Sequence, residues 1–250
     1  MNTLLLLLLD TRAPAGAHHH SGGMEAAIGT GLVTGLAGVE DFCRVRLATS
    51  ARVSAHFAAA ACQLATESAE RAAITPSQPT QWAPDQWAPD QWAPDQWALL
   101  DSEYEARTPS PAMRAASRQL GRGLWRLLRS VLTEAELAAW WRQCAAPSPH
   151  QPLVLGAGVS LAGGGPELAA RAAGLAACAG PASAAARLLG LDPYAVQALL
   201  ARLAPGIDEL ATQAAQNAAG PFSGLPADGA PALDLLADFH LTAEVRLFAS

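Results

Sequence analysis

Apolar and small residues recur at every third or fourth position over two long stretches of the chain. Over residues 39–64 they are Phe42, Val45, Thr49, Val53, Phe57, Ala60 and Leu64. Beyond Pro111 they are Met113, Ala116, Leu120, Leu124, Leu127 and Val131. This spacing places the apolar side chains on one face of an α-helix. We therefore predict one long core helix over each stretch.

Capping residues and prolines mark where further helices start. Thr133 and Glu136 form a capping box for a helix that carries Trp140 and Trp141. Between residues 153 and 219 we expect short, alanine-rich helices, with starts at Pro166, Asp192-Pro193 and Pro205. A last amphipathic helix is expected over residues 231–248, and no stretch alternates apolar with polar residues. The pattern predicts an all-α fold: a single domain over residues 1–250, a bundle of roughly eight to ten helices.

Residues 74–96 interrupt the helical pattern. The pentad QWAPD occurs at 81–85, 86–90 and 91–95, and a fourth copy begins at Gln96. A proline in every copy is incompatible with a helix interior or a central strand, and a period of five is too short for a solenoid. We interpret the segment as a loop insert. It is either a dispensable extension or a docking arm that presents its tryptophans to a partner.

Composition narrows the class of protein. The chain is 51% hydrophobic, which permits a sizeable core, and its net charge of -6 argues against general nucleic-acid binding. The cysteines at 43, 62, 144 and 178 have no zinc or disulfide spacing, which fits reduced thiols in the cytoplasm. Leu4 to Leu9 is too short to span a bilayer and lacks a preceding basic residue, so we expect a buried first helix and no membrane association.

Three histidines stand in one loop, Pro14 to Ala27, just before a predicted helix start. Ser21 or Gly22 is the expected N-cap, which places Glu25 in the first turn, where the helix dipole favours a carboxylate. The loop is open to three interpretations: a metal site, a partner-docking loop or the remnant of an expression tag. His18 and His20 are the candidate metal ligands, with His150 or His240 as possible third ligands, and imidazole suits nickel or zinc.

Four arginines follow one another at four-residue spacing: Arg114, Arg118, Arg122 and Arg126. They form a continuous basic ridge on one helix, and like charges at this spacing destabilise an isolated helix. We therefore expect carboxylates of this chain, solvent alone or an acidic partner face against the ridge.

Motifs of catalysis are missing from the sequence. It has no lysine, hence no phosphate-binding P-loop, and it contains neither G-x-S-x-G nor H-E-x-x-H. Gly156-Ala-Gly158 lacks the βαβ context of a dinucleotide fingerprint. We predict a protein that is not an enzyme and has no resident cofactor.

Four stretches of the chain carry a family resemblance. The first runs from Leu4 to Asp10, then through Pro14-x-Gly16 to His20-Ser21-Gly22-Gly23-Met24-Glu25. The second combines Leu100-Asp101 with Ser117-x-x-Leu120-Gly121-Arg122. The third is His150-x-Pro152-x-Val154-x-Gly156 with Ala184-Ala-Ala-Arg187-Leu188, and the last is His240-x-x-x-Glu244-x-Arg246-Leu247-Phe248-Ala249-Ser250. In this order the chain resembles the urease accessory protein UreF family.

The resemblance implies a non-enzymatic, all-α scaffold in the cytoplasm. Members of the family bind UreD, also called UreH, as a dimer, then recruit the GTPase UreG and deliver nickel to the urease apoprotein. Nickel in transit is the one metal implied. Carried over to this chain, the expected partner-binding residues are His20, Ser21, Gly23, Glu25, Arg122, Glu244, Arg246, Phe248 and Ser250. Two alternatives stay open: a metal-dependent hydrolase that uses His18 and His20, and a helical adaptor unrelated to urease.

Overall fold

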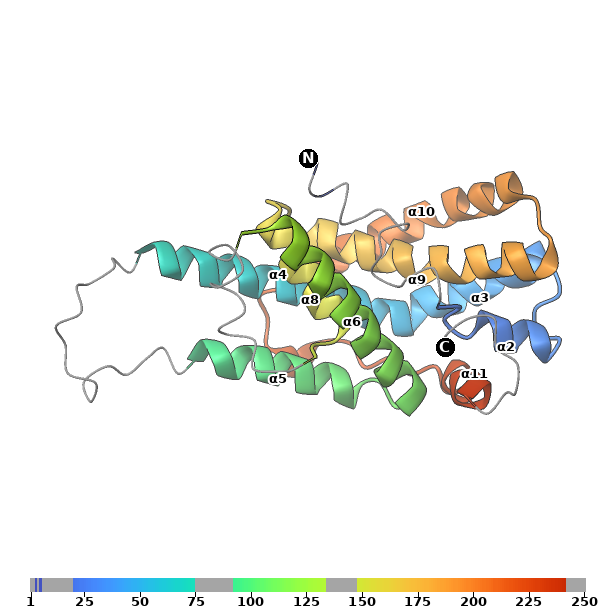
Figure 1. Cartoon of the computed structure of the whole chain (residues 1–250), viewed down its shortest axis with the longest axis horizontal. Helices are drawn as coiled ribbons and strands as arrows, with labels where there is room; N and C mark the ends of the chain where they lie inside the picture. The colour runs from blue at the N-terminus through green and yellow to red at the C-terminus, as the bar shows by residue number, and fades with distance from the viewer. Residues whose placement is uncertain (1–2, 4, 6–19, 75–91, 134–147, 242–250) are drawn as a thin grey trace.

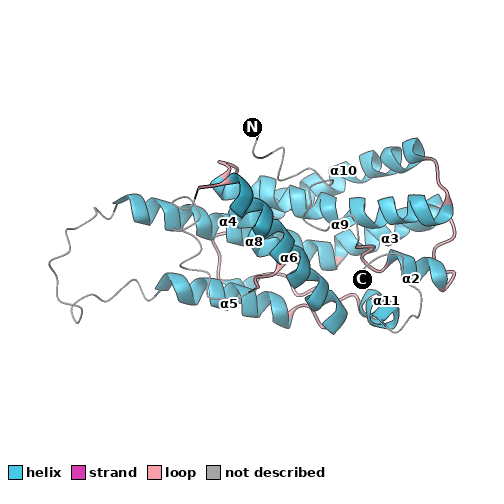
Figure 2. Cartoon of the chain, viewed as in Figure 1, coloured by secondary structure: helices cyan, strands magenta, loops and turns pink. Residues whose placement is uncertain are grey.

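The computed structural model describes residues 3, 5, 20–74, 92–133 and 148–241. Within these residues it contains nine α-helices, one 3-10 turn and no strand, which confirms the predicted all-α bundle (Figure 2). The elements are α2 (Met24–Gly29), α3 (Leu36–Ala48), α4 (Ser50–Ile74), α5 (Trp92–Ala106), α6 (Pro111–Val131), α8 (Gln151–Leu161), α9 (Pro166–Leu189), α10 (Pro193–Gln216), η2 (Phe222–Gly224) and α11 (Pro231–Leu241).

The helices form two neighbouring groups (Figure 1). In one group α4 packs against α8, while α6 crosses α8 obliquely and α5 lies alongside α4. In the other, the short helix α2 and the helix α3 pack against α9, α10 lies along both α3 and α9, and α11 contacts α2 and α6. α9 and α10 belong to both groups and join them.

The hydrophobic core divides in the same way. The first cluster centres on α4 and α8 and includes Phe57, Trp97 and Leu128. The second centres on α2, α3 and the later part of α9, and it includes Met24, Phe42 and Leu199. Residues of α9 and α10 contribute to both clusters, so these two helices fix the position of one core relative to the other.

Small residues let the central helices approach closely. A Cβ placed on Gly156 of α8 would lie 2.2 Å from the carbonyl oxygen of Ala58 in α4. α9 has alanines on most of its buried face. By length and composition it is the only helix of the described segments that would be long enough to cross a membrane. It packs against α2, α3, α4, α8 and α10, and a buried core helix meets the same criteria.

The predicted single helix over residues 39–64 is wrong, because the chain breaks it at Thr49. There the backbone leaves the helical region, with φ -129° and ψ -106°, and the hydroxyl of Thr49 donates to the carbonyl oxygen of Val45 at 2.7 Å. A β-branched hydroxyl residue competes in this way with the helical hydrogen bonds. α3 and α4 are therefore two helices rather than one, and Val45 is half exposed rather than part of the core.

Two of the three helix starts predicted between residues 153 and 219 are observed. Pro166 and Pro193 occupy first turns as predicted, and Asp192 caps α10 by accepting from the backbone N–H of Tyr194. The start at Pro205 is wrong, since Pro205 lies inside the 24-residue helix α10. Its ring faces solvent, while Leu203 and Ile207 on the buried face continue without a break. Packing against α9 thus carries the helix through the proline.

The end of the tryptophan repeat is helical. α5 begins at Trp92, so residues 92–96 of the expected loop form its first turn. A proline is tolerated in a first turn because the N–H groups there have no helical partner. Residues 75–91, the capping-box helix with Trp140 and Trp141, and most of the leucine run lie outside the described residues. Of that run, Leu5 is buried in the first core cluster.

Candidate partner-binding site

The loop at His20–Glu25 is folded into the molecule. Gly22 and Gly23 both have left-handed backbones, with φ 57° and 90°, which side-chain-bearing residues rarely adopt. The backbone N–H of Met24 donates to the carbonyl oxygen of Ser21 at 3.1 Å. The N-cap of α2 is therefore Gly23, not Ser21 or Gly22 as predicted, while Glu25 does lie in the first turn. The side chains of His20 and Ser21 are buried, and Glu25 remains partly exposed.

A buried arginine holds this loop against α9. Arg46 of α3 donates through Nη1 to the carbonyl oxygen of Gly22 and through Nε to that of Ala177, each at 2.9 Å. A Cβ on Gly22 would lie 3.3 Å both from Nη1 of Arg46 and from Cγ of Pro181. We call this arrangement of Gly22, Arg46 and Ala177 the carbonyl joint, because in the described part of the chain only carbonyl oxygens accept from its guanidinium.

The arginine ridge of α6 is divided between two environments. Arg114 and Arg118 face α5: Arg114 pairs with Glu105 at 2.9 Å, and Arg118 pairs with Glu105 at 2.7 Å and with Asp101 at 2.8 Å. This confirms carboxylates of the chain itself as the partners of the first half of the ridge. Arg122 and Arg126 are exposed, and no carboxylate of the described residues pairs with either of them.

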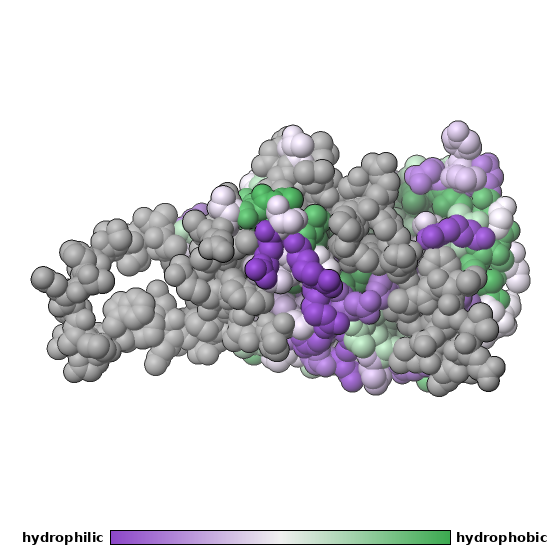
Figure 3. All heavy atoms as spheres, viewed as in Figure 1, coloured by the Kyte–Doolittle hydropathy of each residue, from purple (hydrophilic) through white to green (hydrophobic). Residues whose placement is uncertain are grey.

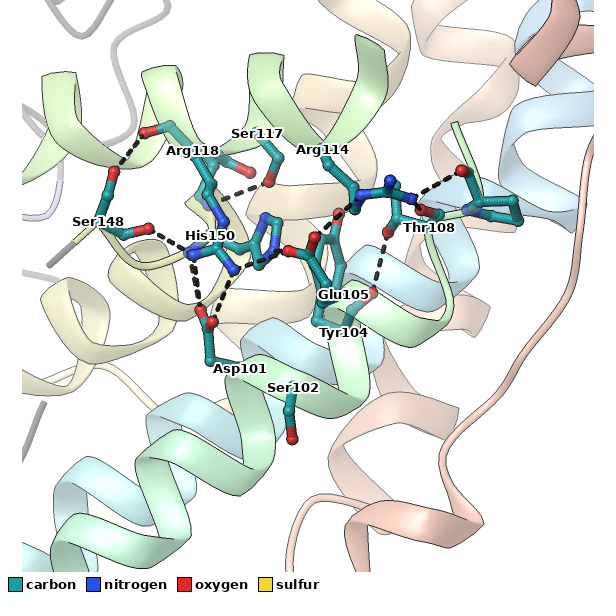
Figure 4. A network of polar contacts seen from close by, with 12 residues as sticks. Asp101, Ser102, Tyr104, Glu105, Thr108, Arg114, Ser117, Arg118, Ser148 and His150 are labelled. Carbon is teal, nitrogen blue, oxygen red and sulfur yellow. Dashed lines mark hydrogen bonds and ion pairs between the residues drawn. The ribbon is translucent and has the colours of Figure 1, made fainter. Parts of the chain in front are cut away.

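A second arginine-centred site joins α5, α6 and the start of α8 (Figure 4). Arg118 also donates to the carbonyl oxygen of Ser148 at 2.6 Å. The backbone N–H of His150 donates to Asp101 at 3.2 Å, and its ring Nε2 lies 2.7 Å from Glu105. The His150 side chain has no exposed surface. We call Asp101, Glu105, Arg118 and His150 the ionic joint.

The electrostatics of the ionic joint favour a neutral imidazole beside a charged carboxylate. Burial lowers the pKa of His150, and the positive charge of Arg118 lowers it further. Burial alone would raise the pKa of Glu105, but hydrogen bonds from Arg118 and His150 outweigh it and hold that pKa below its usual value. A neutral ring with its proton on Nε2 donates to Glu105, which leaves the buried Nδ1 without a hydrogen-bond partner.

The Ser117-x-x-Leu120-Gly121-Arg122 motif lies against the same joint. Ser117 accepts from the backbone N–H of Gln151 at 3.2 Å and so caps the first turn of α8 from outside. A Cβ on Gly121 would lie 2.1 Å from the carbonyl oxygen of Pro149, so only glycine fits there. Arg122 donates to the hydroxyl of Ser148 at 2.8 Å. Three residues of the motif thus contact the segment 148–151: Ser117 and Arg122 through hydrogen bonds and Gly121 through close packing.

The outer half of the ridge forms an exposed basic row. Arg122, Arg126 and Arg129 are exposed on α6. Figure 3 shows hydrophilic side chains gathered along the course of this helix. α6 is held at its N-cap Ser110 by Asp238 of α11 and at Arg118 by the ionic joint, and its later residues Leu124 and Leu128 are buried in the first core cluster. The row therefore stands on a helix that is fixed along its length.

Sequence reasoning placed some of these residues and missed others. It named Asp101 only as part of a family motif and His150 as part of a motif and as a possible metal ligand, and it named neither Glu105 nor Arg46. The spacing of residues did indicate a role for Glu105 and for Arg46. Asp101 and Glu105 are four residues apart, so they share a helix face, as Arg114 and Arg118 do. Arg46 stands four residues after the buried Phe42, an unusual place for a charge.

Several predicted site residues lie outside the described part of the chain: His18, Glu244, Arg246, Phe248 and Ser250. The metal site at His18 and His20 is therefore described only at His20. Among the described residues, no group of three or more histidine, cysteine or acidic side chains is placed to hold a metal ion. His150, a possible third ligand, is bonded to Glu105 instead.

Comparison with known proteins places the chain in a family. The sequence model of the UreF family matches residues 33–204, which is more than half of the chain. The chain belongs to the UreF family. The predicted resemblance is thus confirmed, and the matched region contains the ionic joint, Arg46 and the exposed basic row. The His20–Glu25 loop and the C-terminal tail lie outside it.

Curated relatives agree with this family. The chain is 39% identical over 166 residues to the urease accessory protein UreF of Mycobacterium bovis and 38% identical to that of Mycobacterium tuberculosis. The protein of the same name from Mycobacterium marinum is 40% identical over 164 residues. Each alignment covers 66% of this chain and 62% of the relative, so the chain spans less than two thirds of the curated proteins it matches.

Proposed function

We propose that this chain is a cytoplasmic accessory protein of urease maturation that acts by binding partners. The proposal is supported by its membership in the UreF family and by the name, urease accessory protein, that its mycobacterial relatives bear. In detail, the chain bridges UreD or UreH and the GTPase UreG as a homodimer within the complex. The complex delivers nickel to the urease apoprotein, and no catalytic residue of this chain takes part.

The exposed basic row is the observation on which the binding mechanism rests. Its first two members, Arg122 and Arg126, have no carboxylate partner among the described residues, whereas the neighbouring Arg114 and Arg118 are paired. Exposed arginines on a fixed helix lose little conformational freedom when they pair with an acidic partner surface. We assign Arg122, with Arg126 and Arg129, as the contact for such a surface.

The loop and the tail have different parts in the proposal. Because His20, Ser21 and Gly23 are buried, they shape the docking loop, and Glu25 is its partly exposed charged residue. Glu244, Arg246, Phe248 and Ser250 of the tail remain proposed anchors. Removal of residues 246–250 should weaken partner binding and leave the helix content unchanged.

Co-purification tests the proposal directly. The chain is expressed with its UreD and UreG counterparts, with and without GTP and nickel, and the products are sized by light scattering. We expect a stable complex with at least UreD. No association under any of these conditions would refute the proposed function.

Charge removal tests the basic row within that complex. The double variant Arg122→Gln with Arg126→Gln should weaken association at least ~10-fold and reduce its dependence on salt, because exposed charges mainly steer encounter. Arg44→Gln is the matched control, since Arg44 is an exposed arginine on α3 that forms only an ion pair with Glu40 one turn away. Equal affinities of the two variants would show that the row is not a contact.

A further inference from the structure

Arg46 is a buried cation without a matching anion. Only 8% of the residue is exposed, and no carboxylate among the described residues pairs with it. Burial lowers the pKa of Arg46, but an arginine titrates so far above neutrality that the guanidinium keeps its charge. Two of its five N–H groups donate to the carbonyl oxygens of the carbonyl joint, which leaves three without an acceptor in the described part of the chain. A buried charge in this state is costly unless an anion accompanies it.

The guanidinium of Arg46 lines a cavity where α3, α4 and α9 lie side by side (Figure 1). The cavity has a volume of about 380 Å³, which is in the range of pockets that hold small molecules. Apolar side chains, including Val53, Leu124 and Leu155, form much of its wall. Arginines outnumber aspartates among the charged residues described in its lining: Arg46, Arg107, Arg171 and Arg187, with Asp228 and Asp234. The charges of the lining therefore favour an anion.

Ser50 supplies a free hydroxyl in the same cavity. It is the first residue of α4 and follows Arg46 across a turn in which the N–H of Thr49 donates to the carbonyl oxygen of Arg46 at 3.1 Å. Its hydroxyl oxygen is buried and has no hydrogen-bond partner among the described residues. By contrast, the hydroxyls of Ser54 and Tyr104, which also line the cavity, bond to one another at 3.0 Å. Arg46 and Ser50 thus both have donors available to a ligand.

We propose that Arg46 and Ser50 bind a small monovalent carboxylate with a short apolar chain in this cavity. The planar guanidinium matches the two oxygens of a carboxylate and pairs with them through its free N–H groups. The hydroxyl of Ser50 donates to one of the same oxygens, and the apolar wall contacts the rest of the molecule. One negative charge balances one guanidinium, whereas a divalent phosphate would bring a second charge into apolar surroundings.

Calorimetric titration of the purified full-length chain with sodium butyrate tests this site. The titration needs no urease partner, so its outcome is independent of the co-purification test. Ionic strength is held constant with sodium chloride, and butyramide, which has nearly the same shape but no charge, is titrated in parallel with inorganic phosphate. We expect a single butyrate bound per chain, no binding of butyramide and weaker binding of phosphate. Absence of butyrate binding, equal binding of butyramide or tighter binding of phosphate would overturn the proposal.

Variants of the two donors locate the bound butyrate. Arg46→Met should abolish binding. Ser50→Ala should weaken binding ~10-fold without lowering the melting temperature of the ligand-free chain, because the hydroxyl that is removed has no partner there. Arg171→Met is the matched control, since Arg171 also lines the cavity but already pairs with Glu167 and Asp208, and it should bind butyrate as the wild type does. Unchanged affinity of Ser50→Ala would contradict the assignment even if Arg46→Met does not fold.

Discussion

The ionic joint and the carbonyl joint have the same structural role but use different interactions. Each uses an arginine to fasten a loop to helices that lie far away in the sequence. In the ionic joint Arg118 is balanced by the carboxylates of Asp101 and Glu105. In the carbonyl joint the more deeply buried Arg46 is held by two backbone carbonyl oxygens.

The difference decides what each joint responds to. The ionic joint contains an imidazole and carboxylates, so its strength depends on protonation. The carbonyl joint holds its cation with oxygens that do not titrate. We infer that acid weakens the first joint and leaves the second unchanged. The predictions below test this contrast.

The largest effect is expected from Gly121→Ala. The added methyl group would overlap the carbonyl oxygen of Pro149, so α6 must move away from the segment that carries His150. We expect a loss of at least about 3 kcal/mol in the free energy of unfolding, measured with chemical denaturant. Gly206→Ala is the control, since nothing lies within 4 Å of its Cβ position in α10 and alanine favours a helix. Similar stabilities of the two variants would show that the close approach at Gly121 is not needed.

A smaller and unequal effect is expected when each arginine is replaced by methionine. Arg118→Met leaves the buried Asp101 without its cation and Glu105 paired with Arg114 alone, and we expect a loss of about 2 kcal/mol. Arg46→Met leaves two carbonyl oxygens unpaired but also removes a buried charge, so about 1 kcal/mol is expected. Denaturation of both variants under identical conditions measures the difference. A larger loss of stability for Arg46→Met than for Arg118→Met would contradict the claim that only the ionic joint depends on paired charges.

The smallest effect is the dependence of the ionic joint on pH. The folded pKa of His150 lies below its ordinary value of 6.5, so below pH 6.5 the unfolded chain binds the proton first and stability falls. The folded pKa of Glu105 lies below 4.5, so its contribution is complete above pH 4.5 and is lost as the pH falls through the folded value. Both groups therefore make the joint weaker in acid.

Hydrogen exchange can resolve this effect by region. Between pH 7 and pH 5, after correction for the intrinsic exchange rates, amides at the start of α8 should lose protection while those of α2 keep theirs. When the measurement is extended below pH 4.5, Glu105→Gln should lack the further loss of protection that the wild-type chain shows there. Equal loss in α8 and α2 would mean that acid acts on the whole fold.

Local patterns predicted much of this structure, and the errors have both local and long-range causes. The helical class, the start of α6 at Pro111 and the start of α10 at Asp192-Pro193 follow from signals within a few residues. The continuation through Pro205 depends on packing against α9, whereas the break at Thr49 depends on one hydroxyl group that competes with the helical hydrogen bonds and does not alter the apolar spacing. The contacts of Arg46 could not be predicted from the sequence either. Its oxygen partners are backbone atoms, 24 and 131 residues away, and the identity of the side chains does not indicate them.

The position of α9 across both cores has a consequence for synthesis on the ribosome. α2 and α3 cover their apolar faces with α9 and α10, which are translated more than 110 residues later. At cellular elongation rates this interval lasts on the order of ten seconds. Throughout it Met24, Phe42 and Cys43 have no native surface to cover them. The N-terminal helices are therefore the part of the nascent chain that most needs protection from aggregation.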